Sequence, residues 1–338
     1  MQFHKLISDS PFSFEAGGSV RHFEVAYHTS PRKYRKGEKV VWICHALTAN
    51  SDAEDWWPEL VGPGKFIDTD KYYVVCVNVP GSPYGTTGPS SINPDTGREY
   101  FLTFPKVTVR DMVRATILVR KELGIEHIDL VIGSSIGGFQ AIEWSIMEPD
   151  VIRNLFFMAS DIKVSPYITA FEECQRMALE ADPTFREAAS LKGGEAGLRC
   201  ARAIALISYR SYDGYDLTQQ EEDRDFMFAS RAASYERYQG KKLSDRFDAY
   251  SYKSLADSAD SHNVGRGRGG VEQALRNIKA RTVVIGIDSD CIFPARRMQA
   301  IASLIPGAEY HEISSDFGHD GFLLETTQIA DIMRPLLA

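Results

Sequence analysis

Short apolar runs alternate with helical segments through the first half of the chain, and this alternation limits the fold more than any other feature of the sequence. Each run suits a buried strand, and apolar residues recur at helical spacing over 109–123 and 136–147. Strands that alternate with helices form a mostly parallel sheet with helices on both faces. The predicted strands cover residues 40–44, 72–79, 128–132, 155–158, 282–287 and 309–313.

The alternation stops between residues 165 and 270, where the chain becomes polar and mostly helical in pattern. The clearest helices in this segment are predicted over 196–209 and 219–238, and strand signals return after it. A closing helix is predicted over 326–337. We therefore predict one α/β domain formed by residues 1–160 and 275–338, with a helical lid insertion at 161–274.

Composition excludes several classes of protein. The 38 Lys and Arg residues against 46 Asp and Glu give a net charge of −8, which argues against nucleic acid as the main partner. Five scattered cysteines without a C-x-x-C pair argue against a disulfide framework and a zinc site. The sequence shows no secretory signal and no run of the roughly 20 apolar residues that a membrane span needs. We expect a cytoplasmic enzyme that needs no metal.

A candidate nucleophile lies where the third predicted strand meets a helix. The segment 133–137 fits G-x-S-x-G, the pattern of a serine on a tight strand-to-helix turn. Such a turn needs very small residues two positions to either side of the serine. Ser135 has Gly133 and Gly137 at those positions, whereas Ser134 would have Ile132 and Ile136. The pattern therefore selects Ser135.

A serine nucleophile needs a base and an orienting carboxylate, which follow it in the order acid, then histidine. His319 lies in a loop after the last predicted strand, whereas His311 falls within that strand. Asp288 and Asp290 both follow the preceding strand, and Asp290 is preferred because it lies further past the strand end. The predicted triad is Ser135, Asp290 and His319.

The same chemistry requires two backbone N–H groups that face the developing oxyanion. One should come from Ile136, the residue after the nucleophile. The other should come from the loop after the first predicted strand, where Leu47 is the candidate. His45, in that loop, is predicted to be structural.

Together these segments resemble the homoserine O-acetyltransferase family of the α/β-hydrolase fold, and the resemblance extends over nearly the whole chain. It implies a doubly wound, mostly parallel sheet with a helical lid insertion. It also implies a ping-pong reaction that moves an acetyl group from acetyl-CoA through Ser135 to the hydroxyl of L-homoserine, in methionine biosynthesis, with no separate cofactor. The matching stretches are 44–48, 84–89, 91–94, 110–113, 137–144, 209–211, 246–249, 264–269, 288–290 and 318–320.

Further roles follow from the resemblance. Arg202 and Tyr209, two turns apart on one helix, match the family's substrate-holding arginine and tyrosine, and a guanidinium suits an α-carboxylate. Asp320, beside His319, matches the carboxylate that receives the substrate ammonium. The resemblance also implies a homodimer formed through the helical insertion, for which a lid alone is the competing interpretation.

The chain departs from the family at the nucleophile and before Tyr84. It has Gly-Ser-Ser-Ile-Gly-Gly at 133–138 and Pro-Gly-Ser-Pro at 80–83, where the family usually carries Gly-Gly-Ser-Met-Gly-Gly and a Leu-Gly-Gly-Cys type of sequence. These changes leave open a succinyl-CoA donor, serine as acceptor, or an esterase in which water replaces the acceptor. A non-catalytic binding protein on the same scaffold is a further alternative.

One glycine-rich segment is not assigned to the active site. Residues 265–270 formally contain G-x-G-x-x-G, but they follow polar residues rather than a buried strand, which argues against a dinucleotide site. We expect this loop to return the chain from the insertion to the core. Its arginines, Arg266 and Arg268, either contact CoA phosphates or serve the surface.

Overall fold

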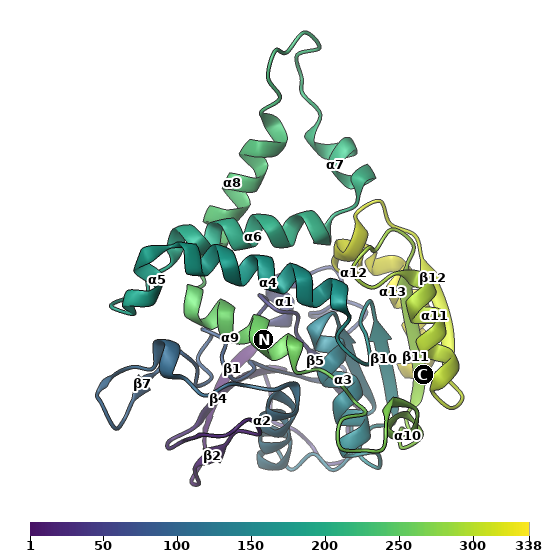
Figure 1. Ribbon diagram of the computed structural model, residues 1–338. Helices are drawn as coiled ribbons and strands as arrows, with labels where there is room; N and C mark the ends of the chain where they lie inside the picture. The colour runs from purple at the N-terminus through teal and green to yellow at the C-terminus, as the bar shows by residue number, and fades with distance from the viewer. Residues whose placement is uncertain (338) are drawn as a thin grey trace.

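The computed structural model describes residues 1–337, and an eight-stranded sheet forms its centre (Figure 1). The strand order is β1-β4-β6-β5-β9-β10-β11-β12. The last six of these strands are parallel, and β1 and β4 run antiparallel at one edge. The strands are β1 (Gln2–Ile7), β4 (Glu24–Thr29), β5 (Val40–Cys44), β6 (Tyr73–Val77), β9 (Leu130–Ser134), β10 (Asn154–Met158), β11 (Arg281–Ile287) and β12 (Glu309–Ile313).

Helices cover both faces of the sheet, as the fold prediction requires. Successive strand residues point to opposite faces, so Trp42 of β5 packs in one apolar core while Val41 and Ile43 pack in the other. The first core includes side chains of α2 (Val109–Glu122), α3 (Ile136–Met147), α10 (Val271–Leu275) and α11 (Ala295–Leu304). The second includes those of α1 (Ala53–Trp56), α12 (Gly321–Leu324) and α13 (Thr326–Leu337).

Two short hairpins and two 3-10 turns lie outside the central sheet. Two short hairpins pair β2 (Phe12–Ser13) with β3 (Ser19–Val20) and β7 (Ile92–Asn93) with β8 (Arg98–Glu99). Two 3-10 turns are η1 (Phe101–Thr103) and η2 (Gly318–Asp320). None of the helices described over residues 1–337 is both long enough and apolar enough to cross a membrane.

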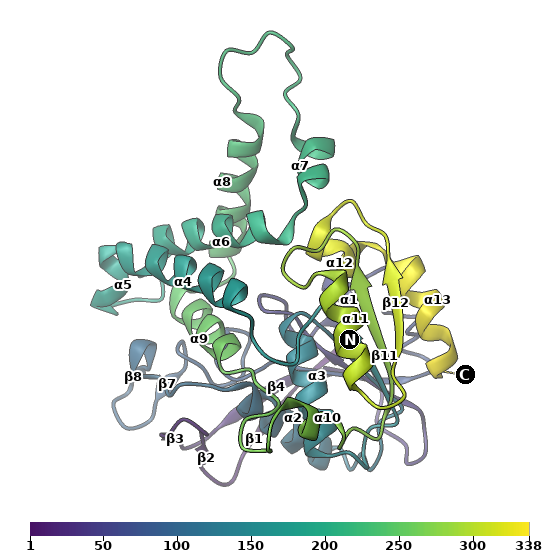
Figure 2. The same cartoon turned by 45° about the vertical axis from the view of Figure 1, so that its right-hand side comes forward.

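Between β10 and β11 the chain forms helices and, among the described residues, no named strand. These helices lie together at one end of the sheet (Figure 2). They are α4 (Pro166–Ala181), α5 (Pro183–Glu187), α6 (Glu195–Tyr209), α7 (Tyr212–Gln219), α8 (Arg231–Ser244) and α9 (Ala249–Asp260), and only α10, which packs on the sheet, follows them before β11. The α7–α8 arm projects away from the rest of the molecule in both views (Figures 1 and 2).

The single helix predicted over 219–238 is wrong. Helix α7 ends at Gln219, and α8 starts only at Arg231. The carboxylate of Glu221 accepts the backbone N–H groups of Ser230 and Arg231, the latter at 2.7 Å, and so satisfies donors at the start of α8. In the segment between, the backbone N–H of Asp225 bonds to the Asp223 carboxylate at 2.9 Å, a local bond that competes with helix.

Candidate active site

Ser135 lies on a strained turn between β9 and α3. Its φ of 57° and ψ of −131° place it in a conformation that a non-glycine residue rarely adopts. A Cβ atom on Gly133 would collide with the carbonyl group of Gly137, and one on Gly137 would collide with that of Cys44. The crowding that the sequence predicts around Ser135 is therefore present, and it exposes this side chain at the carboxyl end of the sheet.

His319 and Asp290 form a buried hydrogen-bonded pair. Nδ1 of His319 donates to Oδ2 of Asp290 at 2.7 Å, and both side chains are almost fully buried. The other carboxylate oxygen, Oδ1, accepts the backbone N–H groups of Ile292 at 2.8 Å and Phe293 at 3.0 Å. Because the carboxylate fixes the proton on Nδ1, Nε2 is left with a lone pair that accepts a proton.

The alternatives weighed for these two residues have other partners. Asp288 accepts the hydroxyl of Ser314 at 2.7 Å and the backbone N–H of Ser315 at 3.1 Å, so it holds two neighbouring loops together. His311 lies within β12, as predicted. His45 is buried between the carbonyl of Ala46 and the backbone N–H of Val79, and burial lowers its pKa to about 4. A histidine that stays neutral and bonded at both nitrogens is a structural residue.

The two candidate oxyanion donors lie on either side of Ser135. Leu47 is in the loop after β5, and Ile136 is the first residue of α3. Within residues 1–337, no protein acceptor receives the backbone N–H of either residue. Both groups are therefore available to an oxygen atom bound at Ser135.

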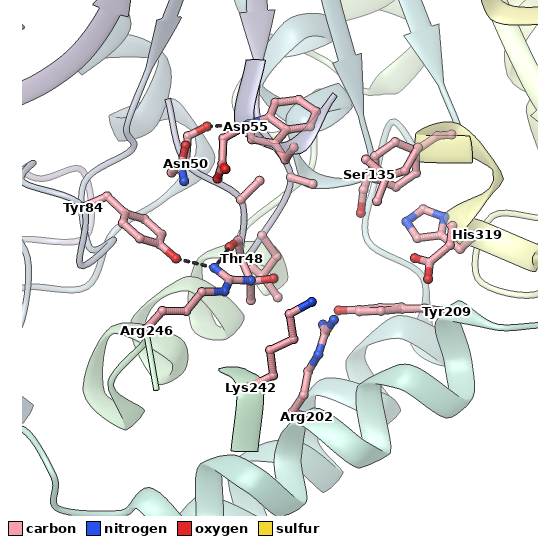
Figure 3. Close-up of a pocket in the computed structure, with 17 residues that line it drawn as sticks. Thr48, Asn50, Asp55, Tyr84, Ser135, Arg202, Tyr209, Lys242, Arg246 and His319 are labelled. Carbon is pink, nitrogen blue, oxygen red and sulfur yellow. Dashed lines mark hydrogen bonds between the residues drawn. The ribbon is translucent and has the colours of Figure 1, made fainter. Parts of the chain in front are cut away.

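A pocket of about 460 Å³ brings most of the predicted residues together (Figure 3). Ser135 and His319 line it from the sheet, and Arg202 and Tyr209 extend toward it from α6 (Figure 3). The guanidinium of Arg202 lies 5.6 Å from the centre of the Tyr209 ring, and burial raises the pKa of the Tyr209 phenol. No carboxylate in the described chain lies within ion-pair distance of Arg202. Its charge is thus free to hold an anion.

Asp320 also lines the pocket, but it already has a partner. Its Oδ2 lies 2.7 Å from Nε of Arg210, the residue after Tyr209. The sequence prediction assigned no role to Arg210, although the residue stands in a stretch that carries the family resemblance. An ammonium group at Asp320 would therefore share the carboxylate with this guanidinium.

Sequence reasoning missed further residues of the pocket wall. Lys242 of α8 extends into the pocket (Figure 3), and no ion pair or hydrogen bond of its ammonium group is present among the described residues. Arg246 instead donates to the carbonyl of Thr48 at 2.6 Å and to the hydroxyl of Tyr84. No motif marks Lys242, and although Arg246 stands in a stretch that matches the family, only the folded insertion brings the two residues to this pocket. Asp55 and Trp56, from α1, complete this wall.

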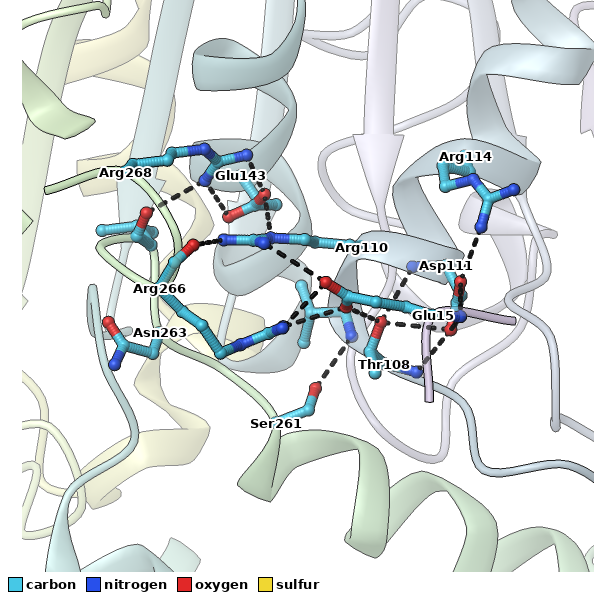
Figure 4. Close-up of polar contacts among 12 residues, drawn as sticks. Glu15, Thr108, Arg110, Asp111, Arg114, Glu143, Ser261, Asn263, Arg266 and Arg268 are labelled. Atoms are coloured by element: carbon cyan, nitrogen blue, oxygen red, sulfur yellow. Dashed lines mark hydrogen bonds and ion pairs between the residues drawn. The ribbon is translucent and has the colours of Figure 1, made fainter. Parts of the chain in front are cut away.

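The glycine-rich loop at 265–270 lies outside the pocket, and its arginines bind carboxylates (Figure 4). The guanidinium of Arg266 donates to both carboxylate oxygens of Glu15, at 2.8 and 2.9 Å. Arg268 contacts the buried Glu143 at 2.5 and 2.9 Å. Arg110 lies between the two acids and donates to Glu143 at 3.0 Å and to Glu15 at 3.2 Å. The alternative in which these arginines contact CoA phosphates is thereby disfavoured, because their charges are used within the protein.

Within residues 1–337, no three His, Cys, Asp or Glu side chains gather in a way that could hold a metal ion.

Several known proteins with sequences similar to this chain are homoserine O-acetyltransferases. A profile described as the α/β-hydrolase fold matches residues 39–326. Homoserine O-acetyltransferase of Cyclobacterium marinum is 41% identical over 95% of this chain and 91% of its own, and that of Chlorobaculum parvum is 38% identical over 98% and 95%.

Solved structures agree on the fold. Homoserine O-acetyltransferase from Bacillus anthracis superimposes with a TM-score of 0.90 at 25% identity and covers 99% of this chain and 97% of its own. The structure of esterase E22 reaches a TM-score of 0.89 at 24% identity, with full coverage of both chains, which shows the shared fold alone. The predicted fold class is confirmed. Because its sequence relatives are homoserine O-acetyltransferases and the fold profile matches most of its length, the chain belongs to the homoserine O-acetyltransferase family of the α/β-hydrolase fold.

Proposed function

We propose that this protein transfers an acetyl group from acetyl-CoA to the hydroxyl of L-homoserine through an acetyl-Ser135 intermediate. The observation that carries the proposal is the placement of Arg202, without a carboxylate partner, in the same pocket as Ser135 and His319. A guanidinium in that position can pair with the α-carboxylate of a free amino acid. A simple ester has no α-carboxylate and needs no such partner.

In the first half-reaction, Nε2 of His319 takes the proton of the Ser135 hydroxyl, and Oγ attacks the thioester carbonyl of acetyl-CoA. The negative charge that forms on the carbonyl oxygen faces the backbone N–H groups of Leu47 and Ile136. The C–S bond then breaks, and the CoA thiolate takes the proton from His319. Asp290 stabilises the imidazolium form during these steps.

In the second half-reaction, the homoserine hydroxyl gives its proton to Nε2 of His319 and attacks the acetyl carbon. The bond to Oγ breaks, and Ser135 recovers a proton from His319. Arg202 and Tyr209 hold the carboxylate end of homoserine. Asp320 receives the ammonium end, and its carboxylate also pairs with Arg210. The product, O-acetylhomoserine, belongs to methionine biosynthesis, and the reaction needs no cofactor beyond its acyl donor.

The proposal extends to assembly and location. The α7–α8 arm exposes large apolar side chains, among them Met227 at 85% and Phe228 at 82%, and a second copy of the chain would bury them as a homodimer. Light scattering should give the mass of a dimer, and Met227→Ser with Phe228→Ser should give a monomer. We place the enzyme in the cytoplasm, where its two substrates are made.

An assay of CoA release tests the reaction itself. We would offer acetyl-CoA or succinyl-CoA with homoserine, with serine or without an acceptor. Sustained release is expected only from acetyl-CoA with homoserine. Equally rapid release without an acceptor would identify a hydrolase and refute the transferase, and preference for serine or succinyl-CoA would refute the assigned substrates.

A further inference from the structure

A second, smaller compartment of about 40 Å³ adjoins Ser135, and neither Arg202 nor Lys242 lines it. Ser135 lines both spaces, and so do Leu47 and Tyr209, so the two meet at the candidate nucleophile. The wall of the small compartment is mainly apolar, with Phe139 and Phe293 among its residues. A cavity of this size has room for about two or three water-sized groups.

One acidic side chain closes this apolar compartment. Glu172, on α4, is 7% exposed, and its Oε2 atom has no hydrogen-bond partner. Burial, reinforced by the nearby charge of Asp260, raises its pKa to about 8. The arginine one turn further along α4, Arg176, is engaged elsewhere, with Glu173 at 2.8 Å and Asp260 at 2.9 Å. Glu172 is thus a buried acid with no cation bonded to it, in the wall of the compartment that Ser135 also lines.

We propose that this compartment receives the acyl group and that Glu172 restricts it to short, uncharged acyl chains. The inference rests on the proposed function and deepens it. In an acyl-Ser135, the carbonyl carbon bears Oγ, the oxygen that faces Leu47 and Ile136, and the acyl substituent. Because the large pocket has to admit CoA and then homoserine, the substituent is left with the small compartment.

The small volume of the compartment and its lack of cations both disfavour a succinyl group. An acetyl group places a methyl in the compartment, whereas a succinyl group would add a methylene and a carboxylate. No Lys, Arg or His is among the described residues that line the compartment, so that carboxylate would lose its water without gaining a cation. Beside it, Glu172 offers no positive charge that could replace the lost water.

The test measures kcat/KM for acetyl-, butyryl- and succinyl-CoA at saturating homoserine. In Glu172→Ala, the butyryl-to-acetyl ratio should rise at least about tenfold over wild type, since each methylene admitted to an apolar pocket changes specificity by about that much. Glu172→Gln keeps the size of the side chain, so its butyryl-to-acetyl ratio should stay within about twofold of wild type. Glu172→Val, which also shortens the side chain, should repeat the Ala result if the Ala variant does not fold.

Glu173→Ala is the matched control, because Glu173 neighbours Glu172 on α4 but is exposed and pairs with Arg176. Its acyl preference should equal that of wild type. An unchanged ratio in Glu172→Ala and Glu172→Val, or a wild type that uses succinyl-CoA as well as acetyl-CoA, would overturn the inference. A wild type that transfers no acyl group to homoserine would instead overturn the proposed function, so the two failures are distinguishable.

Discussion

Two groups of cations in this protein differ in whether carboxylates pair with them. In the cluster around the glycine-rich loop, Arg110, Arg266 and Arg268 hold Glu15 and Glu143 through several short contacts (Figure 4). In the substrate pocket, Arg202 and Lys242 come from two insertion helices and have no carboxylate partner in the described chain (Figure 3).

The difference separates a structural cation from one that is available to a ligand. Arg110 is 19% exposed and Arg268 21%, so partial burial alone does not mark an arginine as ligand-binding. Pairing does, because a guanidinium already bound to two carboxylate oxygens has little charge left for a substrate. The arginines that look most like a phosphate site in the sequence therefore stabilise the fold, whereas Arg202 and Lys242 line the pocket that contains Ser135.

The largest expected effect concerns Ser135, which lines the same pocket as both unpaired cations. Ser135→Ala should lower turnover by at least about 10³-fold, because no acyl-enzyme forms without Oγ. Ser134→Ala is the matched control and should keep most of the activity, since Ser134 ends β9 and its side chain lines neither compartment. Loss of activity in Ser134→Ala with activity retained in Ser135→Ala would reverse the assignment.

The second prediction tests the unpaired cations. Arg202→Ala should raise KM for homoserine about 10- to 100-fold, the value of a charged hydrogen bond or two, and leave the first release of CoA unchanged. Lys242→Ala should act in the same direction with a smaller effect. Lys241→Ala is its control, because Lys241 is exposed and pairs with Asp245 at 2.7 Å. A lower melting temperature with an unchanged KM would make Arg202 a structural residue.

The paired cluster should respond in the opposite way. Arg268→Ala leaves the buried Glu143 with Arg110 as its remaining cation, and we expect a loss of about 1 to 3 kcal/mol in the free energy of unfolding. KM for homoserine should not change. Urea denaturation and steady-state kinetics on the same variant check both statements. A raised KM without loss of stability would break the distinction between the two groups.

The smallest effect concerns pH. The hydrogen bond and charge of Arg266 lower the pKa of Glu15 from 4.5 to about 2. A carboxyl group whose pKa is lower in the folded state contributes its stabilisation above the unfolded pKa and loses it as the pH falls toward the folded value. The stability difference between wild type and Glu15→Gln should therefore be constant above about pH 5 and shrink between pH 4.5 and 2. A difference that does not change over this range would contradict the pairing.

The parallel part of the sheet could be predicted because its strands are buried on both faces and form continuous apolar runs. The antiparallel strands β1 and β4 were missed, since β1 is at the edge and its side chains are largely exposed. The helix predicted over 219–238 failed because its apolar spacing continues across a segment in which Glu221 binds backbone donors.

Ser135, Asp290 and His319 follow one another in the chain order that the fold requires, which is why the sequence could propose them, and the structure brings Asp290 and His319 into contact. The partners of other site residues could not be predicted. Arg210 meets Asp320, and Glu172 comes to line the same compartment as Ser135, only through the packing of insertion helices on the core. Such contacts join residues that no local pattern connects.

The central claim is that Ser135 carries the acetyl group between two substrates. We would incubate the protein with acetyl-CoA alone, measure its intact mass, locate the modification by peptide mapping, and then add homoserine. The account predicts a mass increase of one acetyl group on Ser135, which disappears as O-acetylhomoserine forms. Release of CoA with no acetyl group on the protein, at a rate that homoserine does not change, would contradict it.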